Sequence, residues 1–189
     1  MNTVNFKIES NQKVSEIFKA KGISDFHQAM TYVMELPYKR NNDKKNLLTV
    51  FADNCGTCST KHALLKLLAD ENNFQEVKLI LSFFRMNGKN TPSVNATLKK
   101  YKLEYIPEAH NYLRYHNERI DVTKANWGVS GFMNDVLLET EILPDQITDF
   151  KVSYHKDFLA KWLQENNQIP YGLEEFWEIR EECIKDLYS

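Results

Sequence analysis

Residues 54–71, NCGTCSTKHALLKLLADE, decide how this chain is interpreted. Two cysteines, Cys55 and Cys58, lie three positions apart and precede apolar residues at the spacing of one helical face. The stretch therefore predicts a helix over residues 59–72 with Cys58 at its start. Unpaired N–H groups and the helix dipole favour negative charge at a helix N-terminus, so a thiolate at Cys58 would be stabilised.

The rest of the chain shows helical periodicity at both ends and strand composition in the middle. The helices predicted from apolar spacing are two within residues 14–36, then 97–102, 156–164 and 173–187. The strands predicted from apolar and β-branched composition are residues 47–52, 77–86, 109–115 and 119–123, the last two forming a hairpin. Helices, then strands, then helices predict the α+β class.

The bulk composition narrows the class of protein. A length of 189 residues predicts a single domain, and a net charge of −2 without a basic stripe argues against nucleic acid as a partner. No apolar stretch approaches the roughly 18 residues of a membrane span, and the N-terminus, MNTVNFKIES, lacks the pattern of a secretory signal. An odd number of cysteines does not form a disulfide framework, so we expect a cytoplasmic protein. Without a phosphate-binding glycine motif, no cofactor is predicted.

One interpretation of the cysteine pair is redox chemistry. Residues 50–71 resemble the strand, C-G-x-C motif and helix of a thioredoxin active site, and 101-YKLEYIP-107 resembles the stretch before that family's cis-proline. Two features count against this interpretation. The polar segment 108-EAHNYLRY-115 stands where thioredoxins have a buried apolar strand, and residues 124–189 are more than their single closing helix.

A second interpretation is a zinc site. Cys55, Cys58 and His62 give the spacing C-x2-C-x3-H. A structural zinc site needs a fourth ligand, and the sequence offers only scattered histidines and the distant Cys183. No metal is therefore predicted.

A third interpretation makes Cys58 alone a nucleophile. Thiol catalysis needs a histidine to share the proton and a carboxylate or amide to orient that histidine. The predicted hairpin supplies both, with His110 on its first strand and Asp121 on its second. Their numbers sum to an odd value, so a turn with an even number of residues would put both side chains on one face of the sheet. A single β-bulge would break this expectation.

The order of these motifs resembles the transglutaminase-like superfamily of papain-type thiol enzymes. The resemblance is carried by 56-GTC-58, 109-AHNYL-113 and 119-RIDVT-123, and 32-YVMELPYKR-40 is similar to the segment before that core. It covers residues 26–123. One departure is that many members have an aromatic residue soon after the histidine, where this chain has Asn followed by Tyr.

The resemblance implies a set of roles. Cys58 would be the nucleophile, His110 the general base and then acid, and Asp121 the orienting carboxylate, with Asn54 a candidate beside the Cys58 backbone N–H for the oxyanion. The implied fold is a helix bearing the cysteine packed on an antiparallel sheet, with residues 124–189 as a C-terminal helical extension. The implied chemistry is acyl transfer or amide hydrolysis through a thioester, on a peptide, protein or small amide.

Two other functions stay open at this point. A thioredoxin-like dithiol oxidoreductase would use both Cys55 and Cys58, and a catalytically inactive relative would serve as a binding module. The sequence does not indicate the oligomeric state.

Overall fold

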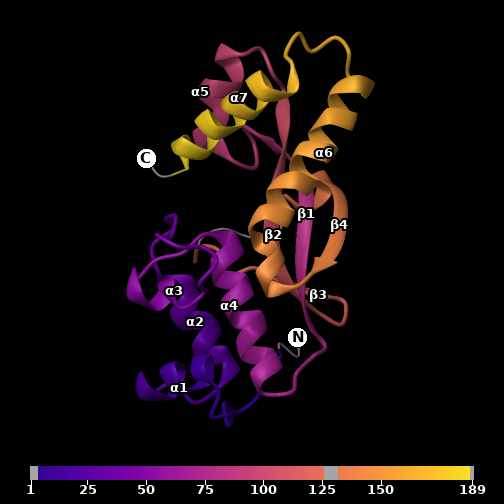
Figure 1. The fold of residues 1–189 in the computed structure, drawn as a ribbon. Helices are drawn as coiled ribbons and strands as arrows, with labels where there is room; N and C mark the ends of the chain where they lie inside the picture. Colours follow the sequence, from indigo (N-terminus) through magenta and orange to yellow (C-terminus); the bar gives the residue numbers. More distant parts are fainter. Residues whose placement is uncertain (1–3, 126–131, 188–189) are drawn as a thin grey trace. The chain divides into compact units, whose positions relative to one another are not determined.

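The computed structural model describes residues 4–125 and 132–187 (Figure 1). Its α-helices are α1 Lys13–Ala20, α2 Phe26–Glu35, α3 Thr49–Ala52, α4 Cys58–Glu71, α5 Asn95–Lys100, α6 Asp149–Glu165 and α7 Leu173–Asp186. Its strands are β1 Val77–Asn87, β2 Tyr105–Tyr115, β3 Glu118–Ile120 and β4 Val136–Ile142, and they form one antiparallel sheet in the order β3-β2-β1-β4. The predicted α+β class is confirmed. No helix in the described parts of the chain is long and apolar enough to cross a membrane.

The chain divides into two compact units, each assembled from separate segments. Unit 1 consists of Met1–Leu81, Asn111–Val129 and Thr140–Thr148, and unit 2 of Ser82–His110, Ser130–Glu139 and Asp149–Ser189. Strands β1, β2 and β4 contribute residues to both. The division does not follow the predicted boundary between a core at residues 26–123 and an extension at residues 124–189, part of which (126–131 and 188–189) lies outside the described residues.

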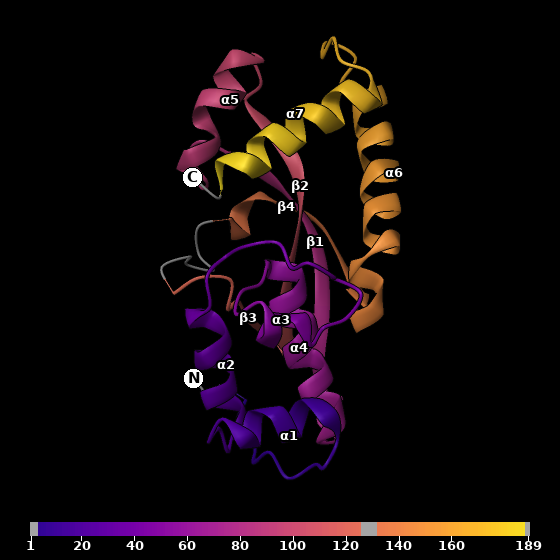
Figure 2. The ribbon, with the colours of Figure 1, turned by 60° about the vertical axis from the view of Figure 1, so that its left-hand side comes forward.

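Helix α4 is the central element of unit 1. It packs against α1, α2, α3 and the short 3-10 helix η3 (Pro144–Ile147), and Figures 1 and 2 both show it beside α2 and α3. Most of its residues are buried. At its C-terminal end the Glu71 carboxylate accepts hydrogen bonds from the backbone N–H groups of Val14 (3.0 Å) and Ser15 (2.7 Å). This carboxylate satisfies the first turn of α1, where a negative charge is favoured.

The strand predicted over residues 47–52 is wrong, because the chain forms the short helix α3 there. Turn chemistry explains the difference. The Asp43 carboxylate accepts from the N–H of Lys45, and the Asn46 side chain accepts from the N–H of Leu48. Such side-chain turns direct the chain into tight i to i+3 bonding. Phe51 of this helix then packs edge-to-face on Phe18 of α1.

The predicted hairpin is present but shorter on its second strand. Leu113 pairs with Ile120 and Tyr115 with Glu118, across a two-residue turn whose first residue, His116, has a φ of 51°. These pairs have odd sums, as predicted. Strand β3 nevertheless ends at Ile120, so Asp121 lies just beyond the sheet.

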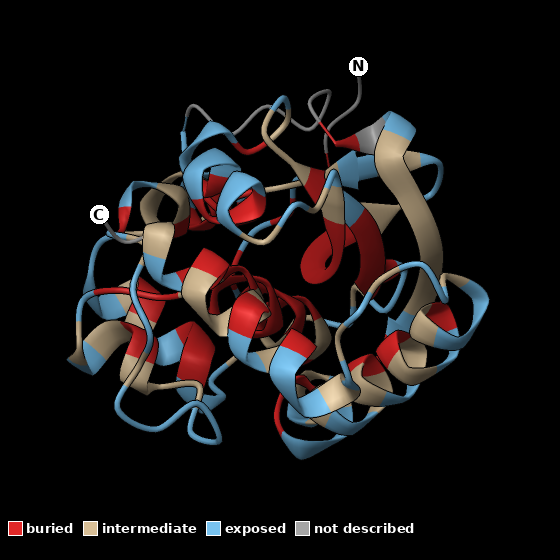
Figure 3. Ribbon diagram, turned by 90° about the horizontal axis from the view of Figure 1, so that it is seen from above, coloured by how far each residue is buried: buried red, intermediate tan, exposed pale blue. Residues whose placement is uncertain are grey.

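In unit 2 the predicted C-terminal helices are confirmed as α6 and α7, which pack against each other, while α7 also contacts α5. Helix α7 is amphipathic, and buried and exposed positions alternate along such helices in Figure 3. The strand β4 was not predicted. His155 is 1% exposed and donates through Nε2 to the carbonyl of Pro107 (2.9 Å).

Candidate active site

Cys58 is the first residue of α4. The residue before it, Thr57, caps the helix, with a reciprocal pair of bonds in which Thr57 N donates to Thr60 Oγ1 (3.0 Å) and Thr57 Oγ1 accepts from Thr60 N (3.5 Å). This capping box fixes the helix start. The N–H of the first helical residue lies outside the helix's own hydrogen-bond ladder, and the dipole favours negative charge at this end. Cys58 is 7% exposed, and its position matches the prediction.

The loop before Cys58 is held by main-chain and side-chain bonds. Gly56 N donates to the carbonyl of Pro37 (3.1 Å), and Lys39 N donates to the carbonyl of Gly56 (3.2 Å). The Asn41 side chain donates to the carbonyl of Cys55 (2.9 Å). These bonds attach the loop to the segment that follows α2.

The glycine of the G-x-C motif is required by close approach. A Cβ atom on Gly56 would lie 2.9 Å from Cγ of Lys61 and 3.0 Å from Oγ1 of Thr60. Both distances are shorter than normal contacts, so a larger residue would displace one of these side chains. Gly56 therefore allows the loop to pass directly over the first turn of α4.

Asp121 and His62 meet in unit 1. The Asp121 side chain is fully buried, accepts from Thr123 N (2.9 Å) through Oδ1, and lies 3.5 Å from His62 Nε2. His62 Nε2 accepts from Val122 N (2.8 Å), and Nδ1 bonds the carbonyl of Cys58 (2.7 Å). A ring nitrogen that accepts an N–H carries no proton, so His62 is the neutral Nδ1–H tautomer and its approach to Asp121 is not an ion pair.

This geometry gives His62 a structural role. Both ring nitrogens are engaged, so neither is available to take a proton from the Cys58 sulfur or to bind zinc. Within the described ranges, no three His, Cys, Asp or Glu side chains are grouped as metal ligands. His62 instead joins the first turn of α4 to the residues that follow β3, and its bond to Val122 explains why β3 ends before Asp121.

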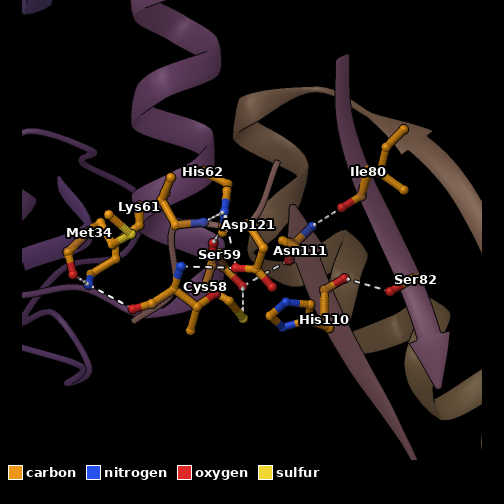
Figure 4. Close-up of polar contacts among 12 residues, drawn as sticks. Met34, Cys58, Ser59, Lys61, His62, Ile80, Ser82, His110, Asn111 and Asp121 are labelled. Atoms are coloured by element: carbon orange, nitrogen blue, oxygen red, sulfur yellow. Dashed lines mark hydrogen bonds and ion pairs between the residues drawn. The ribbon is translucent and has the colours of Figure 1, made fainter. Parts of the chain in front are cut away.

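Asn111 provides a further connection between the sheet and α4. It is fully buried, accepts from Ser59 Oγ (3.0 Å) and donates to the carbonyl of Ile80 in β1 (3.0 Å), as Figure 4 shows. Ser59 is the neighbour of Cys58. Asn111 thus connects β2 to the start of the helix that carries the cysteine.

His110 belongs to unit 2, whereas Cys58 and Asp121 belong to unit 1. His110 is 5% exposed, and its ring lies edge-on to Phe132 (centroids 5.0 Å apart) and to Phe84 (6.1 Å). Its carbonyl accepts from Ser82 Oγ (3.4 Å). Cys58 and Asp121 belong to the same unit, and the meeting of the three side chains stays a prediction.

Lys61 was not identified from the sequence. Its side chain is fully buried, and its ammonium donates to the carbonyls of Leu36 (2.6 Å), Thr123 (2.9 Å) and Met34 (3.4 Å), the last visible in Figure 4. Burial, and after it the nearby charge of Lys124, lower the pKa of Lys61 to about 8, against the opposing influence of Cys58, Asp121 and Cys55.

A sequence signal for Lys61 existed. It lies three, four and seven positions before Leu64, Leu65 and Leu68, which places it on the apolar face of α4. A lysine on such a face is buried and needs internal partners.

The other two cysteines differ from Cys58 in position. All three are free thiols. Burial raises the pKa of Cys55, and Asp53 raises it further. Burial raises the pKa of Cys183 to about 12, and this residue is a core residue of α7.

Asn54 has a backbone role. It is exposed and adopts a left-handed conformation with a φ of 51°, which asparagine tolerates better than most residues. This turn directs the chain from α3 toward Cys55. Its contribution to an oxyanion site stays a prediction.

The surroundings of the cysteine pair differ from the thioredoxin pattern. Helix α3 stands where that pattern has a strand, and the peptide bonds of the described residues, including the one before Pro107, are trans. Helix α4 begins at Cys58, the second cysteine of the pair, and Cys55 lies in the loop before it. Comparisons of the chain with protein-family models, with curated proteins and with solved structures found no match.

Proposed function

We propose that this protein is a thiol-dependent acyl-transfer enzyme of the transglutaminase-like type, with hydrolysis of a peptide or other amide as its main reaction. Cys58 is the nucleophile, His110 the general base and acid, and Asp121 the carboxylate that orients the histidine. The observation that carries the proposal lies in unit 1. There, one His62 ring nitrogen bonds the carbonyl of Cys58, and the other accepts from the N–H of Val122 and lies 3.5 Å from the Asp121 carboxylate. The same histidine therefore links the start of α4 to the segment that carries Asp121.

The assignment of His110 rests on the order of the motifs in the chain. His110 is on β2, the first strand of the hairpin, and Asp121 directly follows β3, the second.

The proposed reaction has two steps. His110 takes the proton of Cys58, and the sulfur attacks the amide carbonyl carbon, forming a C–S bond while the carbonyl electrons move to oxygen. Backbone N–H groups at the start of α4 stabilise this oxyanion. The C–N bond then breaks, His110 returns its proton to the leaving amine, and a thioester remains on Cys58.

In the second step water replaces the amine. His110 takes a proton from water, the hydroxide oxygen bonds to the thioester carbon, and the C–S bond breaks to restore the thiol and release a carboxylic acid. An amine in place of water would give amide transfer. Water is the default acceptor unless the site excludes it.

Acyl-enzyme trapping tests the proposal. Mixed with p-nitrophenyl acetate, the protein should release a stoichiometric burst of p-nitrophenolate and carry an acetyl group on Cys58, located by peptide mass spectrometry. Cys58→Ser should abolish the burst, Cys55→Ser should retain it, and His110→Ala should slow it by about 10²–10⁴-fold. A burst that survives Cys58→Ser would contradict the proposal.

The same variants separate the alternative functions. A dithiol oxidoreductase would form a reversible disulfide between Cys55 and Cys58 in glutathione disulfide, and either substitution would abolish its activity. A binding module would give a folded protein with no burst.

A further inference from the structure

Among the residues that the structure describes, the partners of the buried Lys61 ammonium are backbone carbonyls and not a carboxylate. Its three donors match three backbone carbonyls, those of Met34, Leu36 and Thr123. The ion pairs of the described residues do not include it, although Asp121 is close enough to raise its pKa. A buried charge that is hydrogen-bonded but not neutralised creates a strong local field, because the interior screens it weakly.

Three structural links connect Lys61 to the proposed nucleophile Cys58 and to Asp121. It is three residues after Cys58 in α4, so the two share a helical face. Its Cγ lies against Gly56 of the loop that leads to Cys58. Its ammonium holds the carbonyl of Thr123, and the Thr123 N–H in turn bonds the Asp121 carboxylate.

From this arrangement we propose that Lys61 is a positioning residue of the active site. This proposal rests on the proposed function. Its ammonium anchors the segment carrying Asp121 to α4, and its positive charge stabilises the Cys58 thiolate. The groups that act on it are Lys124, which opposes its protonation, and Cys58, Asp121 and Cys55, which favour it. With a pKa of about 8, Lys61 is mostly charged at neutral pH.

Cys55 and Lys66 provide matched controls for this proposal. Cys55 is 5% exposed against 7% for Cys58, so a difference between their reactivities reports thiolate character rather than access. Lys66 is a lysine of the same helix, also buried, whose ammonium pairs with Asp70. Substituting Lys66 removes a buried lysine without touching the carbonyls that Lys61 binds.

The test is the rate of iodoacetamide alkylation of Cys58 as a function of pH, read by peptide mass spectrometry, in wild type, Lys61→Met and Lys66→Met. In Lys61→Met the pH of half-maximal rate should rise by about one unit, and the rate at pH 7 should fall about tenfold. Lys66→Met should match wild type. An unchanged profile in folded Lys61→Met, or an equal shift in Lys66→Met, would overturn the role of Lys61 while leaving the proposed function intact.

If the wild-type profile is that of an ordinary thiol, with half-maximal rate near about 8.5, both proposals fail together. A second measurement covers a Lys61→Met protein that does not fold. Coupling between two sites is reciprocal, so Cys58→Ser should lower the pH at which the Lys61 amine titrates, followed by the NMR shift of its 13Cε. Titration at the same pH in wild type and Cys58→Ser would overturn the inference.

Discussion

Lys61 in unit 1 and Arg180 in unit 2 are both cations taken out of water, and their partners differ in kind. The Arg180 guanidinium donates to both oxygens of the buried Glu108 carboxylate, with Nε 2.7 Å from Oε2, and also bonds Glu181. Within the described part of the chain, the Lys61 ammonium binds backbone carbonyls. Burial acts against the charge in both, yet the pKa of Arg180 is raised because Glu108 outweighs burial, while the pKa of Lys61 is lowered to about 8.

This difference in partners gives the two cations different roles: Arg180 is neutralised by its carboxylate, whereas the charge of Lys61 can act on neighbouring groups. Burial would raise the pKa of Glu108, but Arg180 overcomes this and the pKa is lowered. The pair neutralises itself and fixes α7 to β2. The charge of Lys61 has no such partner among the described residues, so its field reaches the neighbouring Cys58, Asp121 and Cys55 groups.

The largest expected effect comes from breaking the pair in unit 2. Arg180→Met leaves Glu108 buried without a counter-charge, so the free energy of unfolding in urea should fall by about 3–5 kcal/mol. The exposed pair between Lys78 and Glu141 is the control, and Lys78→Met should cost about 0–1 kcal/mol. Equal losses for the two variants would show that the buried Arg180 pair contributes no more to stability than an exposed ion pair.

Lys61→Met should cost less, because it leaves no opposite charge unpaired. The carbonyls of Leu36 and Thr123 lose a donor, which predicts a loss of about 1–3 kcal/mol in the same urea measurement. The pH dependence has a defined sign. Because the pKa of Lys61 falls from 10.5 to about 8 on folding, the wild type should gain stability as pH rises from 8 to 10.5, and Lys61→Met should lack this gain. A loss of unfolding free energy as large as that of Arg180→Met would contradict the claim that Lys61 has no counter-charge among the described residues.

A smaller effect is expected from the glycine that lies against Lys61. Gly56→Ala forces the Lys61 or Thr60 side chain to shift, so the unfolding free energy should fall by about 1 kcal/mol, near the lower end for overpacking. Gly172→Ala is the matched control, since a Cβ there meets no atom within 4 Å. An unchanged unfolding free energy in Gly56→Ala would show that the Lys61 and Thr60 side chains can move away from the added Cβ without cost.

A pH-dependent effect concerns His155, which lies beside the Glu108 pair. Burial lowers the pKa of His155 to about 4, partly offset by Glu108. Its ordinary value is 6.5, so the unfolded chain binds the proton first, and stability should fall as pH drops from 6.5 to 4. His155→Gln should flatten the dependence of the urea midpoint on pH in this window. A steep wild-type slope retained in His155→Gln would assign the acid sensitivity to other groups.

Much of the fold follows from periodicity in the sequence. The apolar spacing of α4 and the composition of β1 predicted both elements to within a few residues. Helix α3 was missed because Asp43 and Asn46 act through side-chain turns, a local chemistry that outweighs the composition of four residues.

The candidate site was predicted in part. The helix start at Cys58 follows from the sequence. The end of β3 before Asp121 does not, because it depends on the bond from Val122 to His62, sixty positions earlier in the chain. The apolar face of α4 indicates that Lys61 is buried, but the backbone carbonyls that bind its ammonium leave no mark in the residue types.

Titration of the Cys58 thiol tests the central claim most directly. In a Cys55→Ser/Cys183→Ser protein, absorbance at the thiolate band reports Cys58 alone as pH is raised. A nucleophile held at the start of α4 beside Lys61 and partnered by His110 should be largely ionised at neutral pH, and His110→Ala should move the transition upward. A single transition at the ordinary thiol value of about 8.5, unmoved by His110→Ala, would contradict the account.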